Sequence, residues 1–252
     1  MASLLIQCGT VFSLGLILLG AARADEPQEF FQTFANATAQ FDQGKTREAA
    51  ALLQALAVKL QTAPWREIAL LKAGELQESF DRASATKNYE EINARLKERP
   101  AEKLGQVILA LASRGLQRVE TAEVEAALKK YYLAKVEYPA SLDLLVQGKY
   151  LADEKIRNRT GNPYSYSTGV EKLIPTVPRQ TYTLEKIPTP SFGWKDAKIV
   201  GMSAQTALVQ WPNAPSRSLH AGDKADELEV LSVLDNGIIL GNDSRLVVLS
   251  YK

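Results

Sequence analysis

The chain has 252 residues, of which 46% are hydrophobic and 23% charged, a composition typical of a folded globular protein. Thirty basic residues against 29 acidic ones give a net charge of +1, so no overall field attracts a polyanion and no nucleic acid is expected as a partner. One cysteine and one histidine argue against most metal, thiol and triad chemistry, which needs several such side chains together. We therefore expect a protein that is not an enzyme, with no catalytic residue, no metal ligand and no cofactor.

Residues 1–24 have the pattern of a secretory signal peptide. An apolar run from Val11 to Leu19 precedes the small-residue cleavage site Ala22-Arg23-Ala24. Cleavage there predicts a periplasmic protein. The alternative is an uncleaved inner-membrane anchor at residues 2–22, which is nearly long enough to span a bilayer. The only cysteine lies in this segment, so the mature chain would form no disulfide.

Residues 25–119 are predicted to form a helical domain. Apolar side chains recur at spacings of three and four, and breaks at Gly44, Pro64 and Pro100 divide the segment into short-linked, antiparallel helices. The turn from Phe41 to Ala50 resembles that of a tetratricopeptide repeat, in which a small residue lets one helix fold back on the next. Such an irregular helical repeat either binds a peptide or partner helix in its groove or serves as a packed spacer.

Residues 120–170 carry a series of ordered motifs. Thr121 is expected to cap a helix that runs to about Lys135. After this helix come Tyr138-Pro139-Ala140-Ser141-Leu142, Gly148-Lys149-Tyr150-Leu151 and Gly161-Asn162-Pro163-Tyr164-Ser165-Tyr166. Over residues 123–169 this order resembles the core of the major pseudopilin of type II secretion systems. The resemblance implies a helix, a Tyr-Pro turn, a short helix capped by Ser141 and a hairpin, with structural roles for Tyr138, Pro139, Ser141, Leu142, Gly161, Asn162, Pro163, Tyr164 and Tyr166.

Two departures limit what this resemblance implies. A pseudopilin begins with a processing site and a long apolar helix that packs into a filament, whereas here the motifs follow about a hundred helical residues, so assembly as a pilus subunit is not expected. The family's calcium site depends on oxygen ligands, largely acidic. Between Gly169 and Thr189 the only acidic residues are Glu171 and Glu185, so calcium is not expected either.

The remaining residues are expected to form a proline-rich linker, 171–194, and a small β domain, 195–252, near the lower size limit for independent folding. Asp235-Asn236-Gly237 between two apolar runs predicts a hairpin whose Asn and Gly adopt positive φ. Residues 197–250, with Ile199-Val200-Gly201 and Ala221-Gly222-Asp223 among their short motifs, resemble the periplasmic homology region of inner-membrane secretion and pilus components that contact the secretin.

Few other side chains suggest a site. Trp65, Trp194 and Trp211 are possible interface anchors, because interfaces favour tryptophan, with core packing as the alternative. His220 has no cysteine or second histidine with which to bind a metal in the mature chain.

The sequence thus predicts an α+β protein with helical-repeat hairpins, a pseudopilin-like helix and β hairpin, and a small C-terminal β sandwich or barrel. Its predicted function is that of an exported, non-enzymatic adaptor or scaffold of a type II secretion or type IV pilus-like apparatus, with a secretin or an inner-membrane component as protein partner. The alternatives are a cell-wall enzyme or carbohydrate-binding protein with an unrecognised carboxylate site, and a periplasmic chaperone-like helical repeat.

Overall fold

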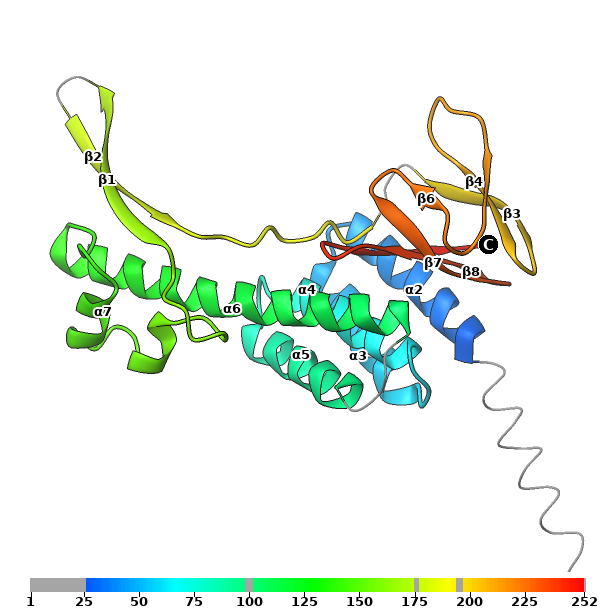
Figure 1. Ribbon diagram of the computed structural model, residues 1–252, viewed down its shortest axis with the longest axis horizontal. Helices are drawn as coiled ribbons and strands as arrows, with labels where there is room; N and C mark the ends of the chain where they lie inside the picture. The colour runs from blue at the N-terminus through cyan, green and yellow to red at the C-terminus, as the bar shows by residue number, and fades with distance from the viewer. Residues whose placement is uncertain (1–25, 98–101, 175–176, 194–196, 252) are drawn as a thin grey trace, which may run out of the picture.

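The predicted α+β fold class is confirmed by a computed structural model that describes residues 26–97, 102–174, 177–193 and 197–251 (Figure 1). Helices that pack as hairpins come first, and small antiparallel sheets follow. The predicted signal peptide lies outside the described residues. Within the described ranges no helix has both the length and the hydropathy required to cross a membrane.

The first four helices form two antiparallel hairpins. An apolar stripe on the first helix, at Phe30, Phe31, Phe34 and Ala37, is buried, and the facing stripes of the next helices complete the core. The chain reverses after this first helix at Gly44, whose φ is +78°. A Cβ at Gly44 would meet no atom within 4 Å, so the turn needs the left-handed backbone that glycine adopts and not the small size expected from the sequence. The helices are α2 (Glu26–Asp42), α3 (Thr46–Lys59), α4 (Trp65–Gln77) and α5 (Arg82–Leu96).

A single helix, α6 (Lys103–Lys135), replaces the two helices expected on either side of Thr121. Thr121 is buried in the middle of α6, and its hydroxyl donates a hydrogen bond of 2.9 Å to the carbonyl of Gln117 instead of capping a new helix. A threonine can stay within a helix when its hydroxyl bonds the carbonyl four residues back. The boundary expected near residue 120 therefore falls inside one helix, which links the helical core to the elements that follow Lys135 (Figure 1).

Tyr89 of α5 fills the space between α4 and α6 because both facing positions are glycine. A Cβ at Gly74 would lie 2.8 Å from the Tyr89 Cε1 atom, and a Cβ at Gly115 would lie 2.4 Å from its Cζ atom. The phenol hydroxyl donates a 2.5 Å hydrogen bond to the Glu78 carboxylate, which also accepts three bonds from the Arg118 guanidinium. The buried ring thus fixes the distance between the two helices that form one wall of the cleft described below.

The second half of α6 carries a separate small core. The short helix α7 (Asp143–Gln147), the 3₁₀ turn η1 (Asp153–Ile156) and the hairpin of β1 (Tyr166–Ile174) and β2 (Val177–Leu184) follow α6. Leu142, and not Ser141, is the residue that precedes α7, and no side chain caps this helix. The buried side chains of this core are Val124, Ala127, Leu128, Leu142, Leu145, Tyr164 and Leu184.

The C-terminal residues form a sandwich of two antiparallel sheets, ordered β3-β4-β5 and β6-β7-β8-β9. Alternate side chains of β8 and β9 point to opposite faces: Ile238, Leu240, Val247 and Leu249 enter the sandwich core, whereas Ile239, Leu246 and Val248 join the helical core. The strands are β3 (Lys198–Ser203), β4 (Thr206–Gln210), β5 (Arg217–Leu219), β6 (Lys224–Ala225), β7 (Leu228–Leu234), β8 (Gly237–Gly241) and β9 (Leu246–Ser250).

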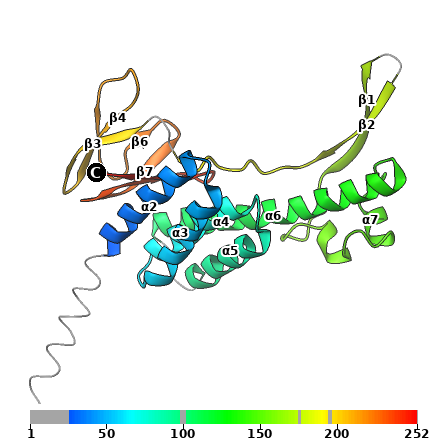
Figure 2. The ribbon, with the colours of Figure 1, turned by 180° about the vertical axis from the view of Figure 1, so that it is seen from behind.

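The sandwich thus shares one face of β8 and β9 with the helical core. It lies against α2, and the Ser250 hydroxyl donates a 2.9 Å bond to the Phe31 carbonyl (Figure 2). The expected β7–β8 hairpin is present, but neither Asn236 nor Gly237 has a positive φ. Gly237 has another role, since a Cβ there would lie 2.5 Å from the Phe31 ring. This glycine allows the sheet to approach α2 closely.

Candidate functional site

The β1–β2 hairpin projects beyond the helical body (Figure 1). Within the described residues its sheet has two strands only, so each strand has one unpaired edge. Residues 167–171 of β1 are all exposed, which means that solvent reaches both faces of this strand. From Ser167 to Val170, and from Gln180 to Thr183 on β2, no residue is charged or proline, although natural edges are commonly protected by such residues. The unprotected part of each edge is therefore four residues long, since Glu171 and Lys172 flank it on β1, and Pro178 and Arg179 flank it on β2.

Three exposed apolar side chains lie on β1 and at the end of α6. Leu133 is 82% exposed, Val136 76% and Val170 63%. Val170 pairs with Gln180, and the Gln180 side chain accepts a 2.9 Å hydrogen bond from the Tyr138 backbone N–H, which places Val170 near the end of α6. The surface formed by Leu133, Val136 and Val170 is called the hairpin patch below.

Val136 adds backbone strain to the hairpin patch. It follows the last residue of α6 with φ +60°, in the left-handed region. Glycine or asparagine usually occupies this position, and a β-branched residue there costs roughly 1–2 kcal/mol. In the described fold Val136 therefore carries backbone strain without gaining burial.

Tyr138, Leu142, Tyr164 and Tyr166 belong to the small core beneath the hairpin. The Tyr138 ring stacks on Tyr132 at 4.6 Å and meets Tyr182 at 4.7 Å between ring centroids. The Tyr166 hydroxyl donates a 2.8 Å hydrogen bond to the Pro139 carbonyl, which ties β1 to the Tyr-Pro turn. Burial raises the pKa of Tyr164 and of Tyr166 to about 12. These tyrosines fix the base of the hairpin.

The loop before β1 is built from its own polar groups. Gly161 has φ +81°, and Asn162 donates its backbone N–H to the Asn158 side-chain oxygen at 3.0 Å. Pro163 forms an isolated bridge with Arg157. These contacts hold Gly161, Asn162 and Pro163 in the loop that leads into β1.

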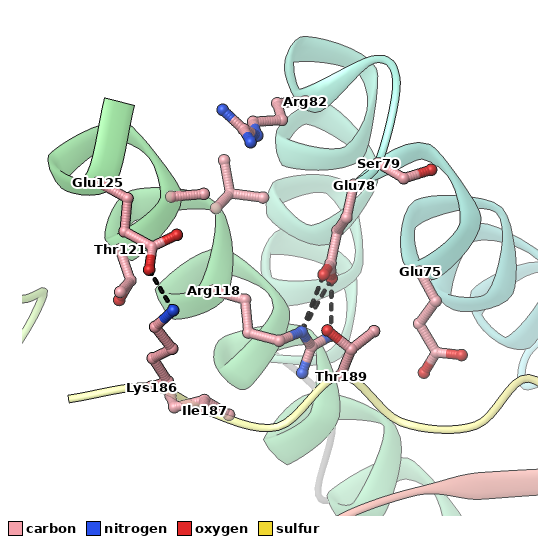
Figure 3. A pocket seen from close by; sticks show the side chains of 12 residues that line it. Glu75, Glu78, Ser79, Arg82, Arg118, Thr121, Glu125, Lys186, Ile187 and Thr189 are labelled. Atoms are coloured by element: carbon pink, nitrogen blue, oxygen red, sulfur yellow. Dashed lines mark hydrogen bonds and ion pairs between the residues drawn. The ribbon is translucent and has the colours of Figure 1, made fainter. Parts of the chain in front are cut away.

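A second feature was not expected: residues 185–193, called the strap, run along α6 from the hairpin to the sandwich (Figure 1). The strap and the strand β2 occupy the segment expected to be a linker. Between the strap, α4 and α6 lies a cleft of about 260 Å³ (Figure 3). Its charged side chains are Glu75, Glu78, Arg82, Arg118, Glu125 and Lys186.

Ion pairs neutralise most of this cleft. Arg118 binds Glu78 at 2.7 Å, and Lys186 of the strap pairs with Glu125 of α6 (Figure 3). Glu75 is buried beside the fully buried Lys72, with 2.8 Å between Lys72 Nζ and Glu75 Oε2. Burial raises the pKa of Glu75, although Lys72 acts in the opposite direction. The other carboxylate oxygen of Glu75 is buried without a hydrogen-bond partner.

This arrangement offers little for acid–base or nucleophilic chemistry. The carboxylates of Glu78 and Glu125 are held by cations, and the Ser79 hydroxyl donates to the Leu76 carbonyl. The histidine that could act as a base, His220, lies in the turn after β5, where its backbone N–H donates a 2.8 Å bond to Asp223. No group of three potential metal-ligating side chains occurs in the described part of the chain.

The tryptophans have different positions. Trp65 is 8% exposed and its ring lies 5.1 Å from that of Phe30, so it belongs to the helical core and not to an interface. Trp211 is half-buried and packs against the sandwich core. Trp194 lies outside the described residues.

Sequence reasoning missed the strap and the hairpin patch. Phe192, which anchors the strap, stood in a proline-rich segment that reads as a linker. Val136 and Leu133 stood in the periodic pattern of a helix end, where exposure depends on what packs nearby. Comparisons with known proteins add no further guide, since no family model, curated protein or solved structure matches this chain.

Proposed function

We propose that this chain is an exported, non-enzymatic adaptor of a type II secretion or type IV pilus-like envelope apparatus, which acts by binding other proteins. The observation that carries the proposal is the projecting β1–β2 hairpin with its open edges, together with the hairpin patch. The sequence resemblances to secretion components suggest the apparatus, and a secretin or inner-membrane component is the proposed partner.

The hairpin supports this function through its energetics. A two-stranded hairpin is marginally stable in water, and a third strand or a packing surface is needed to stabilise it. Here the base is packed through Tyr166, Tyr182 and Leu184, but Ser167 to Glu171 remain exposed. An extended partner segment would add backbone hydrogen bonds along an edge and cover Val170, as in other cases of strand addition.

The rest of the fold is suited to hold this hairpin at a distance. The continuous α6 carries the hairpin at one end, and its other end packs on α5 and β7. Lys103 near the start of α6 pairs with Glu229 of β7. A continuous helix between the helical core and the small core beneath the hairpin gives a fixed separation between the hairpin and the sandwich, which suits a protein that connects partners.

A test uses the tagged protein in envelopes of its own bacterium, with capture after crosslinking and identification of secretin and inner-membrane components. The Val136→Gly variant removes the strain and the apolar side chain together, so it should raise stability by about 1 kcal/mol and yet reduce partner recovery several-fold. Val170→Asp should also reduce partner recovery several-fold, because it places a charge in the proposed interface.

The matched control is Val58→Asp, because Val58 is an equally exposed valine (69%) on α3, remote from the hairpin. It should leave recovery unchanged. If the wild-type chain recovers no secretion or pilus component, or if Val136→Gly and Val170→Asp recover as much as wild type, the proposal is wrong.

A further inference from the structure

The strap is held on the helices by side chains alone. Within the described residues no backbone hydrogen bond involves residues 186–193. Pro188 and Pro190 have no N–H to donate and keep the residues before them extended. The strap therefore lies on the body as an extended peptide, without joining a sheet or helix.

Phe192 is the most deeply buried side chain of the strap. Phe192 is 5% exposed, whereas residues 185, 186, 188, 189 and 191 are exposed. The Phe192 ring stacks on Phe34 with 5.7 Å between centroids and an interplanar angle of 10°, and it lies 4.9 Å from the Phe41 ring. A single buried aromatic anchor in an otherwise exposed peptide is the pattern of a binding hot spot.

Charged groups complete the contact. Lys72 Nζ lies 5.7 Å from the centroid of Phe192 in a cation–π arrangement, and six residues before the anchor Lys186 pairs with Glu125. The surface under the strap, formed by Phe34, Phe41, Lys72, Glu75 and Glu125, is called the strap groove. At one end of the strap groove Phe34 and Phe41 form an aromatic surface, called the aromatic seat, and at the other end lies the acidic residue Glu125.

The strap neither hydrogen-bonds every buried polar atom of the strap groove nor fills the space beside Phe192. Glu75, which is 7% exposed, keeps one buried carboxylate oxygen without a hydrogen bond at the cleft wall, opposite a strap that carries two prolines. Beside Phe192 a further cavity of about 690 Å³ remains open, lined partly by Phe34, Phe41 and Val248. A peptide with an N–H donor near Glu75 and a larger apolar group beside the aromatic seat would make contacts that the strap does not make.

We propose that the strap groove is a recognition site for an extended, proline-containing peptide of a partner protein, with a basic residue six positions before a phenylalanine, and that the strap occupies this site in cis. Such a peptide is pre-organised and binds aromatic-lined surfaces with little loss of entropy. This proposal deepens the adaptor function and rests on it. The helical repeat would hold one partner at the strap groove while the hairpin holds another.

The test uses a fluorescent peptide with the sequence of residues 185–193, followed by anisotropy with the purified full chain. In the wild type, the tethered strap competes at an effective concentration of order mM, so the free peptide binds weakly. The Phe192→Ala variant loses its own anchor, and the peptide should bind it at least tenfold more tightly. A peptide with alanine in place of phenylalanine is the matched control and should bind neither protein.

A second measurement avoids the risk that Phe192→Ala destabilises the fold. In the wild type, millimolar peptide should displace the strap and accelerate tryptic cleavage after Lys186, whereas the alanine peptide should not. Equal peptide affinities for wild type and a cooperatively folded Phe192→Ala variant, or a cleavage rate that the peptide does not change, would overturn the proposal. Partner capture through the hairpin patch is measured separately, so failure of the strap groove leaves the adaptor function standing and the reverse also holds.

Discussion

Tyr89 packs between two helix glycines, and the substitution Gly115→Ala tests whether this contact sets the distance between α4 and α6. An alanine Cβ at position 115 would lie 2.4 Å from Tyr89 Cζ, against about 3.5–4.0 Å for a normal carbon contact, so the ring would have to move by about 1 Å. The ring also meets Gly74, where a Cβ would lie 2.8 Å away, and its hydroxyl is bonded to Glu78. The ring has no room to retreat.

The expected magnitude follows from two opposed effects. Overpacking of a filled core costs roughly 1–3 kcal/mol, and the upper end applies because Gly74, Gly115 and the Glu78 carboxylate all confine the ring. Alanine gains about 1 kcal/mol over glycine in helix propensity. The net loss in the free energy of unfolding is about 2 kcal/mol, which lowers Tm by roughly 4–8 °C in a chain of this size.

Urea unfolding followed by far-UV circular dichroism measures this loss. The matched experiment repeats Gly115→Ala in a Tyr89→Leu background, where the ring is gone and only the gain in helix propensity remains. There the same substitution should become neutral or stabilising. A midpoint for Gly115→Ala equal to or above that of wild type, at an unchanged m-value, refutes the packing argument.

Two other predictions concern a turn and the tyrosines. Gly44→Ala should lower the free energy of unfolding by about 1 kcal/mol, because φ is +78° there. Gly44→Asn should lower it less, because asparagine tolerates a left-handed backbone. Urea unfolding measures both losses, and equal losses would contradict the strain argument. Burial raises the pKa of Tyr164 and Tyr166 from 10.0 to about 12, so the stability that their neutral forms contribute is fully present below pH 10 and is lost between about pH 10 and 12. Tyr166→Phe should flatten the fall of Tm with pH in this window, and an unchanged slope would argue against the raised pKa.

Local sequence patterns determined most of the elements of this protein. The spacing of Phe30, Phe34 and Phe41 predicts α2, and the apolar runs around Asp235-Asn236-Gly237 predict β7 and β8, because these patterns depend only on which face of an element is buried. The turn, short helix and hairpin after α6 were expected only from the family resemblance of the tyrosine, proline and glycine motifs. The fold class and most strand positions follow from such local signals.

Other features depended on contacts between distant residues, which no local pattern contains. Thr121 can cap a helix or remain inside one, and only the surrounding packing decides that its hydroxyl bonds Gln117. In the sequence, Gly115, Gly74 and Gly237 only weaken the helix or strand that contains them. In the structure each makes room for an aromatic ring from another element, either Tyr89 or Phe31.

The candidate site shows the same division. The sequence pointed to a protein that binds other proteins, since it lacks the usual sets of catalytic side chains. It could not show that Val136 is strained and exposed, because that depends on the backbone at the end of α6. Nor could it show that Phe192 enters the helical core, because Phe34, Phe41 and Lys72 come from positions more than a hundred residues earlier and meet Phe192 only after the helices have packed.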